Sequence, residues 1–184
     1  MSPAPVTIKR LSAGNEAEFA RIHCDATGNG WCHCVAWWVP TWDGWGERTR
    51  EQNAALRAKL FSDGIHDGYL IYAGGDLAGW CQAWRRDAFA KLAAQFGVAS
   101  DDDAWMIGCI LILPEFRACG IAKSAIAQIT DDLKLRGARS VDAYPKRGAN
   151  EPGELWNGPE STYGDLGFQI VHDDPKRPVL RLSF

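Results

Sequence analysis

Apolar and polar residues alternate over residues 6–12, which is the pattern of a half-buried β-strand. Residues 68–86 contain two β-rich runs, and Gly74 and Gly75 between them can adopt the positive φ angles of a tight hairpin. Residues 104–113 are apolar almost without interruption, which predicts a central strand. Three further strands are predicted at 140–144, 168–173 and 178–184.

Between these runs the apolar positions recur every three or four residues, which predicts helices. The clearest helix covers residues 120–137, where Ile121, Ala125, Ile129 and Leu133 share one face. Further helices are predicted at 15–23, 47–64 and 87–97, with a single helical turn at 160–167. Residues 28–46 show neither period and hold five of the nine tryptophans, so we expect a loop or irregular helix there.

The order of these elements predicts a mixed α/β fold. Strand 104–113, helix 120–137 and strand 140–144 follow one another closely, which favours a right-handed unit with parallel strands. The hairpin at 68–86 adds antiparallel strands to the same sheet. With 184 residues and 46% hydrophobic content, the chain can bury one substantial core, so we expect a single domain over residues 1–184.

Charge and composition exclude several classes of protein. The formal net charge is −3, and no basic stripe could neutralise a run of phosphates, so nucleic acid is not an expected partner. The N-terminus lacks the regions of a signal peptide, and no window approaches the roughly 18 apolar residues of a membrane span. We therefore expect a cytoplasmic protein, without a membrane partner, whose six cysteines are reduced.

Residues 114–125, PEFRACGIAKSA, gather small side chains where the central strand leads into the clearest helix. The first amides of a helix lack partners and carry positive potential, so such a start can bind phosphate. Gly120 would let a diphosphate approach the main chain, Ala118, Cys119 and Ala122 are small, and Arg117 offers a charge. Close packing alone would explain the same small residues.

Taken in order, these motifs resemble the GNAT superfamily of acyl-CoA-dependent N-acyltransferases. The family's phosphate motif, Arg/Gln-x-x-Gly-x-Gly/Ala, is matched by Arg117, Gly120 and Ala122. Its lead-in from the strand is matched by Ile112, Pro114, Glu115 and Phe116, and its late Tyr-x-x-x-Gly-Phe by Tyr163, Gly167 and Phe168. The segments WCHCVAWW, DAYP and RPVLRL are similar to a little-characterised bacterial branch, which does not indicate a substrate.

The resemblance implies a mixed, twisted, mostly antiparallel sheet, flanked by helices, whose central parallel strand pair splays apart. Gly108 would be the bulge that starts the splay, or a close-packing glycine. The backbone of residues 110–112 would then be free to pair with the pantetheine arm of acetyl-CoA, the implied co-substrate. The implied cofactor-binding residues are Ile110, Leu111, Ile112, Arg117, Ala118, Cys119, Gly120, Ile121, Ala122 and Lys123.

The resemblance also implies a direct attack of an amine on the thioester, with the oxyanion stabilised by a main-chain amide of the central strand. Tyr163 would be the general acid that protonates the departing sulfur, with a buried structural tyrosine as the alternative. The base stays open. Candidates are a water-mediated path or one of the carboxylates Asp101, Asp102, Asp103, Glu151 and Glu154, each of which could equally be a surface group.

In the family the segment that corresponds to residues 28–46 roofs the acceptor pocket. Trp31, Trp37 and Trp38 are therefore expected to bind the acceptor, because aromatic walls hold apolar or cationic groups. Core packing is the alternative for at least half of the tryptophans in this segment.

Histidines and cysteines between residues 23 and 34 allow two further interpretations. The possible zinc ligands lack paired Cys-x-x-Cys spacing and a second half downstream, so no metal is expected. A nucleophilic Cys32 or Cys34 would need an electropositive, partly exposed setting with His33 or another base nearby. The side chains in question are His23, Cys24, Cys32, His33 and Cys34.

Three functions follow as hypotheses. The first is an acetyl-CoA-dependent N-acetyltransferase, a possible homodimer, that acts on a primary amine of a small molecule or peptide. The second is a non-catalytic acyl-CoA-binding or sensor domain with the same phosphate cradle. The third is a zinc-stabilised interaction module, which a chelator would unfold.

Overall fold

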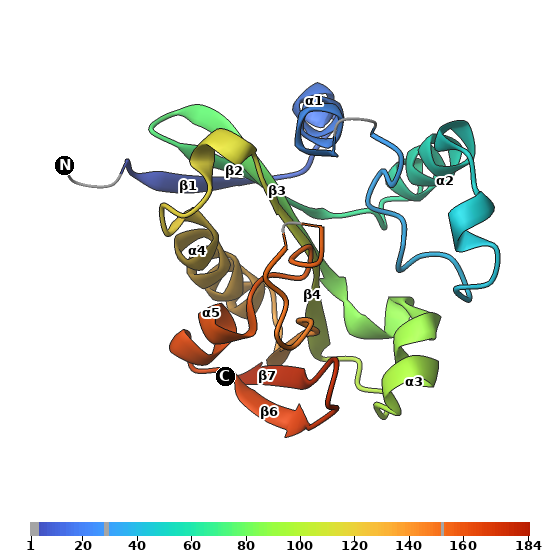
Figure 1. The fold of residues 1–184 in the computed structure, drawn as a ribbon, viewed down its shortest axis with the longest axis vertical. Helices are drawn as coiled ribbons and strands as arrows, with labels where there is room; N and C mark the ends of the chain where they lie inside the picture. The colour runs from blue at the N-terminus through green and yellow to red at the C-terminus, as the bar shows by residue number, and fades with distance from the viewer. Residues whose placement is uncertain (1–3, 28–29, 152) are drawn as a thin grey trace.

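The computed structural model describes residues 4–27, 30–151 and 153–184, with only the backbone at residues 24–27 and 93. These residues contain one seven-stranded sheet in the order β1-β2-β3-β4-β5-β7-β6 (Figure 1). Every neighbouring pair is antiparallel except β4 and β5, which are parallel. The strands are β1 Val6–Arg10, β2 Gly68–Ala73, β3 Asp76–Arg85, β4 Ala104–Ile112, β5 Ser140–Ala143, β6 Gln169–His172 and β7 Val179–Ser183.

Helices lie on both faces of this sheet. The longest, α4, packs its apolar stripe against β1, β2, β4 and β5, while α1 contacts β3 from the other side (Figure 1). The α-helices are α1 Glu16–Thr27, α2 Arg50–Ser62, α3 Ala90–Phe96, α4 Ile121–Leu135 and α5 Glu160–Asp165, with 3₁₀ turns at Trp45–Glu47, Arg86–Ala88 and Pro114–Phe116. No helix among the described residues combines the length and apolarity needed to cross a bilayer.

The predicted mixed sheet, its single parallel pair and its flanking helices are confirmed. Several boundaries differ: α1 extends to Thr27, α3 covers only Ala90–Phe96, and α2 begins at Arg50 and not at residue 47. Thr49 accepts the amide of Gln52, and the Gln52 side chain accepts the amide of Thr49, so this reciprocal capping box fixes the helix start. Residues 30–44 form the predicted irregular loop, while residues 28 and 29 of that prediction lie outside the described residues.

The central strand β4 changes its pairing at Gly108. Gln82 of β3 faces Cys109 and Ala83 faces Ile107, so Gly108 is the extra residue of a bulge. Pairing with β5 ends one residue earlier, at Ile107 and Ala143, and beyond that point the two parallel strands separate. The predicted bulge and splay are therefore confirmed. Gly108 is also closely packed, since an added Cβ would lie 2.7 Å from the Met106 side chain.

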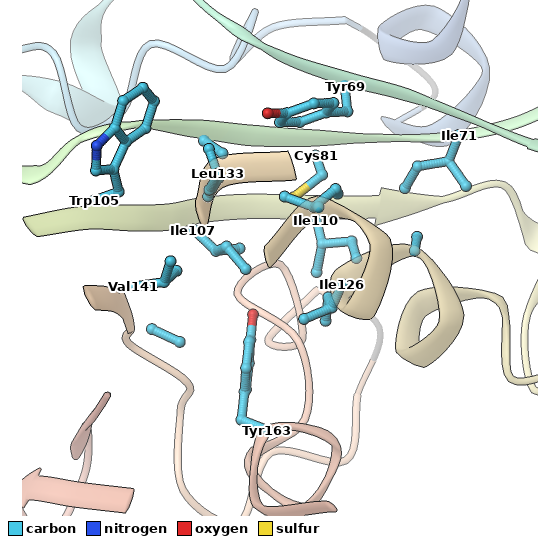
Figure 2. Close-up of a cluster of buried hydrophobic side chains, with 14 of the residues drawn as sticks. Tyr69, Ile71, Cys81, Trp105, Ile107, Ile110, Ile126, Leu133, Val141 and Tyr163 are labelled. Carbon is cyan, nitrogen blue, oxygen red and sulfur yellow. The ribbon is translucent and has the colours of Figure 1, made fainter. Parts of the chain in front are cut away.

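A large hydrophobic cluster fills the space between α4 and the sheet (Figure 2). Tyr163 of α5 belongs to it, and Figure 2 shows its hydroxyl directed toward β4 among Ile107, Ile110 and Ile126. A second cluster on the opposite face joins α1, β3 and the loop that contains Cys34. The splayed end of β4 lies between these two cores.

Candidate active site

A cavity of about 390 Å³ opens at the C-terminal end of β4. Its walls are the last residues of β4, the first turn of α4 and the segment before and within the start of α5. It is lined by Ile110, Leu111, Ile112, Phe116, Arg117, Ala118, Gly120, Ile121, Ala122, Lys123, Leu155, Trp156, Gly158, Pro159 and Thr162. All the predicted cofactor-binding residues line it except Cys119, whose exposed thiol donates to the Arg117 carbonyl at 3.2 Å.

The turn into α4 presents unpaired main-chain amides to this cavity. Gly120 caps the helix with φ 74°, and the first helical bond runs from the Ser124 amide to the Gly120 carbonyl. Within the described chain, no backbone hydrogen bond uses the amides of residues 118–123 as donors. An added Cβ at Gly120 would meet no atom within 4 Å apart from its chain neighbours, so the approach to the turn on this side of Gly120 is open. The 15-residue helix adds its dipole, which makes this an electropositive cup for an anion.

Two cationic side chains flank the cup. Arg117 is exposed, and its Nε donates to the Ile112 carbonyl at 2.9 Å, which holds the guanidinium against the end of β4. Lys123 lies in the first turn of α4, and its ammonium pairs with Asp165 at 2.8 Å. Both side chains line the cavity, so their charges reinforce the positive potential of the amides.

The resemblance implied that the backbone edge of β4 beside the cavity is free, but part of this edge is already paired. The Ile110 amide donates to the Trp156 carbonyl at 2.8 Å, so the expectation is wrong for this amide. Where β5 separates from β4, the loop at Trp156 and Asn157 supplies the missing partners, because a buried amide without one is costly. The Gly108 carbonyl accepts from the Asn157 side chain at 2.8 Å and from the Trp37 indole at 2.9 Å.

Asn157 joins this loop to the rest of the site. The residue is fully buried, and its side-chain oxygen accepts from Arg177 at 2.9 Å. Its backbone carbonyl accepts the Tyr163 hydroxyl at 2.6 Å. Sequence reasoning missed Asn157, since Asn157-Gly158-Pro159 carries only a turn signal and its partners are distant in the sequence.

Tyr163 lies in the wall behind the cavity and does not line it. Its side chain is fully buried, and its hydroxyl is directed at the Asn157 carbonyl. Burial, followed by the nearby Cys81 and Cys109 sulfurs, raises the pKa of the Tyr163 phenol well above its usual value. The phenol therefore keeps its proton at neutral pH. Its role as general acid stays a prediction.

The carboxylates proposed as bases do not converge on the cavity. Asp101, Asp102 and Asp103 precede the opposite end of β4, about 20 Å along the strand from Ile110. Glu151 is exposed, and Glu154 forms an ion pair with Lys146. None of the five lines the cavity, which leaves a water-mediated path as the remaining option of those considered.

The comparison with known families agrees with this geometry. The model of the Acetyltransferase (GNAT) family matches residues 31–152, which include the bulge, the splayed strand and the cup. The chain belongs to the GNAT family. No curated protein matches the chain with significance.

Solved structures show the same fold for this GNAT chain. An aminoglycoside acetyltransferase, AAC(6')-Ib, in complex with coenzyme A has a TM-score of 0.64 at 12% identity, covering 97% of this chain and 95% of its own. The PaiA N-acetyltransferase of Thermoplasma acidophilum, in complex with coenzyme A, has a TM-score of 0.56 at 13% identity. The match covers 98% of this chain and 99% of the other. A GNAT family acetyltransferase of Brucella melitensis, in complex with acetyl-CoA, has a TM-score of 0.56 at 15% identity. The match covers 98% of this chain and 89% of the other.

None of the tryptophans predicted to bind an acceptor lines the cavity of this GNAT domain, and of the three only Trp37 packs against a residue of its wall. Trp37 is buried, with its ring centroid 5.6 Å from that of Trp156, which does line the cavity. Trp38 packs against Phe89 at 4.4 Å. Trp31 donates from its indole to the Arg48 carbonyl at 2.7 Å. Trp156 is thus the aromatic link between the cavity and the tryptophan-rich loop.

The metal interpretation finds no support among the described residues. No group of three or more His, Cys, Asp or Glu side chains in this part of the chain could hold a metal ion. Of the residues considered as zinc ligands, the Cys24 side chain lies outside the description.

Proposed function

We propose that this GNAT protein is an acetyl-CoA-dependent N-acetyltransferase that acts on a primary amine. The observation that carries the proposal is the cup of unpaired, unobstructed amides at residues 118–123, which opens into an apolar cavity beside β4. Structures of the same fold with coenzyme A or acetyl-CoA support it.

The residues present fit this co-substrate. The amides of the cup, with Arg117 and Lys123, would hold the diphosphate, and the Cys119 contribution would be limited to its main chain. The apolar walls formed by Ile110, Leu111 and Ile112 on one side and residues 155–159 on the other would enclose the pantetheine arm. Acetyl-CoA supplies the activated thioester, and no covalent bond to the enzyme is required.

Tyr163 is the proposed proton donor to the departing sulfur. Its raised pKa keeps the phenol protonated, as a general acid requires. To act, the hydroxyl has to leave the Asn157 carbonyl or transfer its proton through a bridging water. Since no candidate carboxylate lines the cavity, we propose that water carries the proton away from the attacking amine.

The acceptor is proposed to be a small-molecule or peptide amine held near Trp31, Trp37 and Trp38. The neighbouring loop already binds an ammonium group, because Lys91 lies 3.4 Å from the ring centroid of Trp42 and 5.7 Å from that of Trp37. Its ammonium also donates to the Ala36 carbonyl. This arrangement supports an aromatic wall suited to a cationic amine.

One observation favours the alternative of a non-catalytic acyl-CoA-binding domain. Neither Tyr163 nor any candidate carboxylate lines the cavity, so the cup could serve binding alone. The two functions share the co-substrate and differ only in acceptor turnover.

Calorimetry with acetyl-CoA tests the shared part of both functions, with Arg117→Ala and Arg139→Ala as a matched pair. Arg139 is an exposed arginine that pairs with Asp103 at 3.1 Å, at the far end of β4. We expect binding by the wild type, weaker binding by Arg117→Ala and unchanged binding by Arg139→Ala. No detectable binding by the wild type would refute both functions.

Release of coenzyme A across a panel of primary amines separates them. Amine-dependent release above the hydrolysis background supports the acetyltransferase. Binding without release from any amine of a broad panel supports the sensor.

A further inference from the structure

Two buried thiols lie in one hydrophobic cluster behind the cavity, and the proposed reaction uses neither. Cys34, in the loop after α1, and Cys109, in β4, are 3% and 7% exposed and belong to the same hydrophobic cluster. Each of the two thiols shifts the pKa of the other, as close neighbours do. This cluster borders the cavity, since Leu111, Phe116 and Trp156 pack against it and also line the cavity wall.

Several independent contacts hold the Cys34 sulfur beside β4. The Gln82 side chain, directly opposite Cys109 in the strand register, donates to the Cys34 carbonyl at 2.8 Å. The Trp80 indole donates to the Cys34 sulfur at 3.2 Å. His33 and Cys34 both adopt left-handed backbone, with φ 47° and 57°. This conformation is strained for residues other than glycine, so the surrounding contacts must enforce it.

These contacts also favour the thiolate form of Cys34. Burial alone would raise the pKa of this thiol, but the neighbouring Cys109 thiol, His23 imidazole and Trp80 indole outweigh burial and lower the pKa to about 6. The same contact with Cys34, followed by burial, raises the pKa of Cys109, which therefore stays protonated. The surroundings thus favour the thiolate form of Cys34 and the thiol form of Cys109.

The pKa values of the other titratable groups around the pair are shifted in the direction that favours their neutral forms. Burial raises the pKa of Cys32 to about 11 and also raises the pKa of Cys81. Burial lowers the pKa of His33 and that of His66, the latter to about 3. Cys34 is therefore the thiol whose ionisation the cluster favours.

We propose that Cys34 and Cys109 form a redox-active pair that a hydroperoxide converts into a disulfide. The Cys34 thiolate attacks one peroxide oxygen and breaks the O–O bond, which gives a sulfenic acid and releases the other oxygen as hydroxide or alkoxide. The Cys109 thiol then attacks the sulfenic sulfur, an S–S bond forms, and the hydroxyl leaves as water with the thiol proton. The two sulfurs lose two electrons in total, and the hydroperoxide gains them.

The disulfide would act on the cavity through β4. Cys109 lies between Gly108 and Ile110, whose backbone groups bind Asn157 and Trp156 of the cavity wall. An S–S bond of about 2.05 Å is far shorter than any non-bonded contact of two sulfurs, so its formation has to shift the bulge or the Cys34 loop. We expect a change of at least severalfold in the Kd for acetyl-CoA. This second consequence rests on the proposed function, and the disulfide itself does not.

The test treats the full reduced chain with hydrogen peroxide, because only a small oxidant can reach thiols this buried. We expect a loss of two hydrogens in the intact mass, a cross-linked peptide that contains Cys34 and Cys109, and reversal by dithiothreitol. Cys109→Ser is expected to accumulate a sulfenic acid at Cys34 that dimedone traps, and Cys34→Ser to form no cross-link. Cys32→Ser, the matched control in the same loop, is expected to form the cross-link as the wild type does.

Peptide mapping of the wild type decides the matter even if a variant fails to fold. A disulfide that joins any other pair of cysteines, or oxidation confined to the exposed Cys119, would overturn the proposal. If acetyl-CoA does not bind but the Cys34–Cys109 cross-link forms, the proposed function fails and the redox pair stands. If acetyl-CoA binds and the cross-link does not form, the redox pair is refuted and the proposed function stands.

Discussion

Gly120 combines two properties at one position, a left-handed backbone and an open approach to the cup. Replacement by alanine would place a side chain in a conformation that costs roughly 1–2 kcal/mol, and no neighbouring atom would clash. The added methyl group would lie at the mouth of the cup. For Gly120→Ala we expect a loss of about 1 kcal/mol in the free energy of unfolding and weaker acetyl-CoA binding, measured by urea denaturation and calorimetry.

Gly137 provides the control, because it follows the other end of α4 with φ 94° and no atom within 4 Å of an added Cβ. Gly137→Ala is expected to lose similar stability with unchanged acetyl-CoA binding. Equal binding by both variants would show that the approach at Gly120 does not matter.

Replacement of Tyr163 by phenylalanine removes only the hydroxyl group and so distinguishes a catalytic role of Tyr163 from a structural one. If the phenol is the general acid, Tyr163→Phe lowers kcat on an accepted amine by on the order of 100-fold, since acid catalysis contributes about that much. The lost hydrogen bond to Asn157 also costs about 1 kcal/mol of stability. Steady-state kinetics and urea denaturation measure the two effects separately.

Tyr69→Phe controls for the loss of a phenolic oxygen elsewhere. Its hydroxyl donates to Asp132 and accepts from Arg136, away from the cavity. We expect a comparable loss of stability with kcat unchanged. Turnover that survives in Tyr163→Phe would remove the acid role.

Among the elements, the segment at residues 155–159 closes the gap that β5 leaves along β4. Asn157→Ala removes the donor to the Gly108 carbonyl and the acceptor for Arg177. The Gly108 carbonyl keeps the Trp37 indole and Arg177 keeps the Tyr144 carbonyl, so two buried hydrogen bonds are lost without leaving either group unpaired. At about 1 kcal/mol for each bond, we expect a loss of roughly 2 kcal/mol in the free energy of unfolding. Hydrogen exchange at the Ile110 amide is expected to accelerate, because the Trp156 carbonyl is less firmly held.

Asn150→Ala is the comparison variant, since its exposed side chain only contacts the Gly148 carbonyl two residues away. We expect a change within about 0.5 kcal/mol. Similar losses in the two variants would contradict the bridging role of Asn157.

Elements with a local signal could be predicted from the sequence, and contacts across the chain could not. The period of α4, the apolar run of β4 and the glycines of the β2–β3 turn each lie within a few residues. The cup at Gly120 has a local signal too, and it was predicted. The closure of β4 by Trp156 depends on a contact 46 positions away from Ile110, and no local pattern encodes it. Asp101, Asp102 and Asp103 are adjacent to β4 in sequence, but they lie at its N-terminal end and the cavity lies at its C-terminal end. The sequence does not show which end of the strand bears the cavity.

The pH dependence of the free energy of unfolding is a property of the whole molecule, because a buried histidine with a lowered pKa takes up its proton in mild acid only when the chain unfolds. Burial, with a further contribution from Arg57, lowers the pKa of His66 from 6.5 to about 3. The unfolded chain therefore binds a proton below pH 6.5 that the folded chain excludes. This contribution to stability is complete above pH 6.5 and falls by up to about 1.4 kcal/mol per pH unit as the pH drops toward 3.

Urea denaturation at pH 7 and pH 5 measures this effect, with His66→Gln compared against His172→Gln. His66 is 2% exposed and lies near Arg57 and His23, whereas His172 lies exposed on the edge strand β6. The stability of His66→Gln is expected to depend less on pH than that of the wild type, and His172→Gln is expected to follow the wild type. Identical pH dependence in all three proteins would exclude His66 as the source.

Trp156 gives the molecule a built-in optical probe. Its indole lines the cavity on one side, while on the other it lies 5.6 Å from the Trp37 ring and 5.3 Å from the Arg177 guanidinium. Any molecule that enters the cavity replaces water against this indole, which alters its fluorescence and the energy transfer to Trp37. Occupancy can then be followed in real time on the unlabelled chain, with Trp156→Phe removing the signal that arises at the cavity.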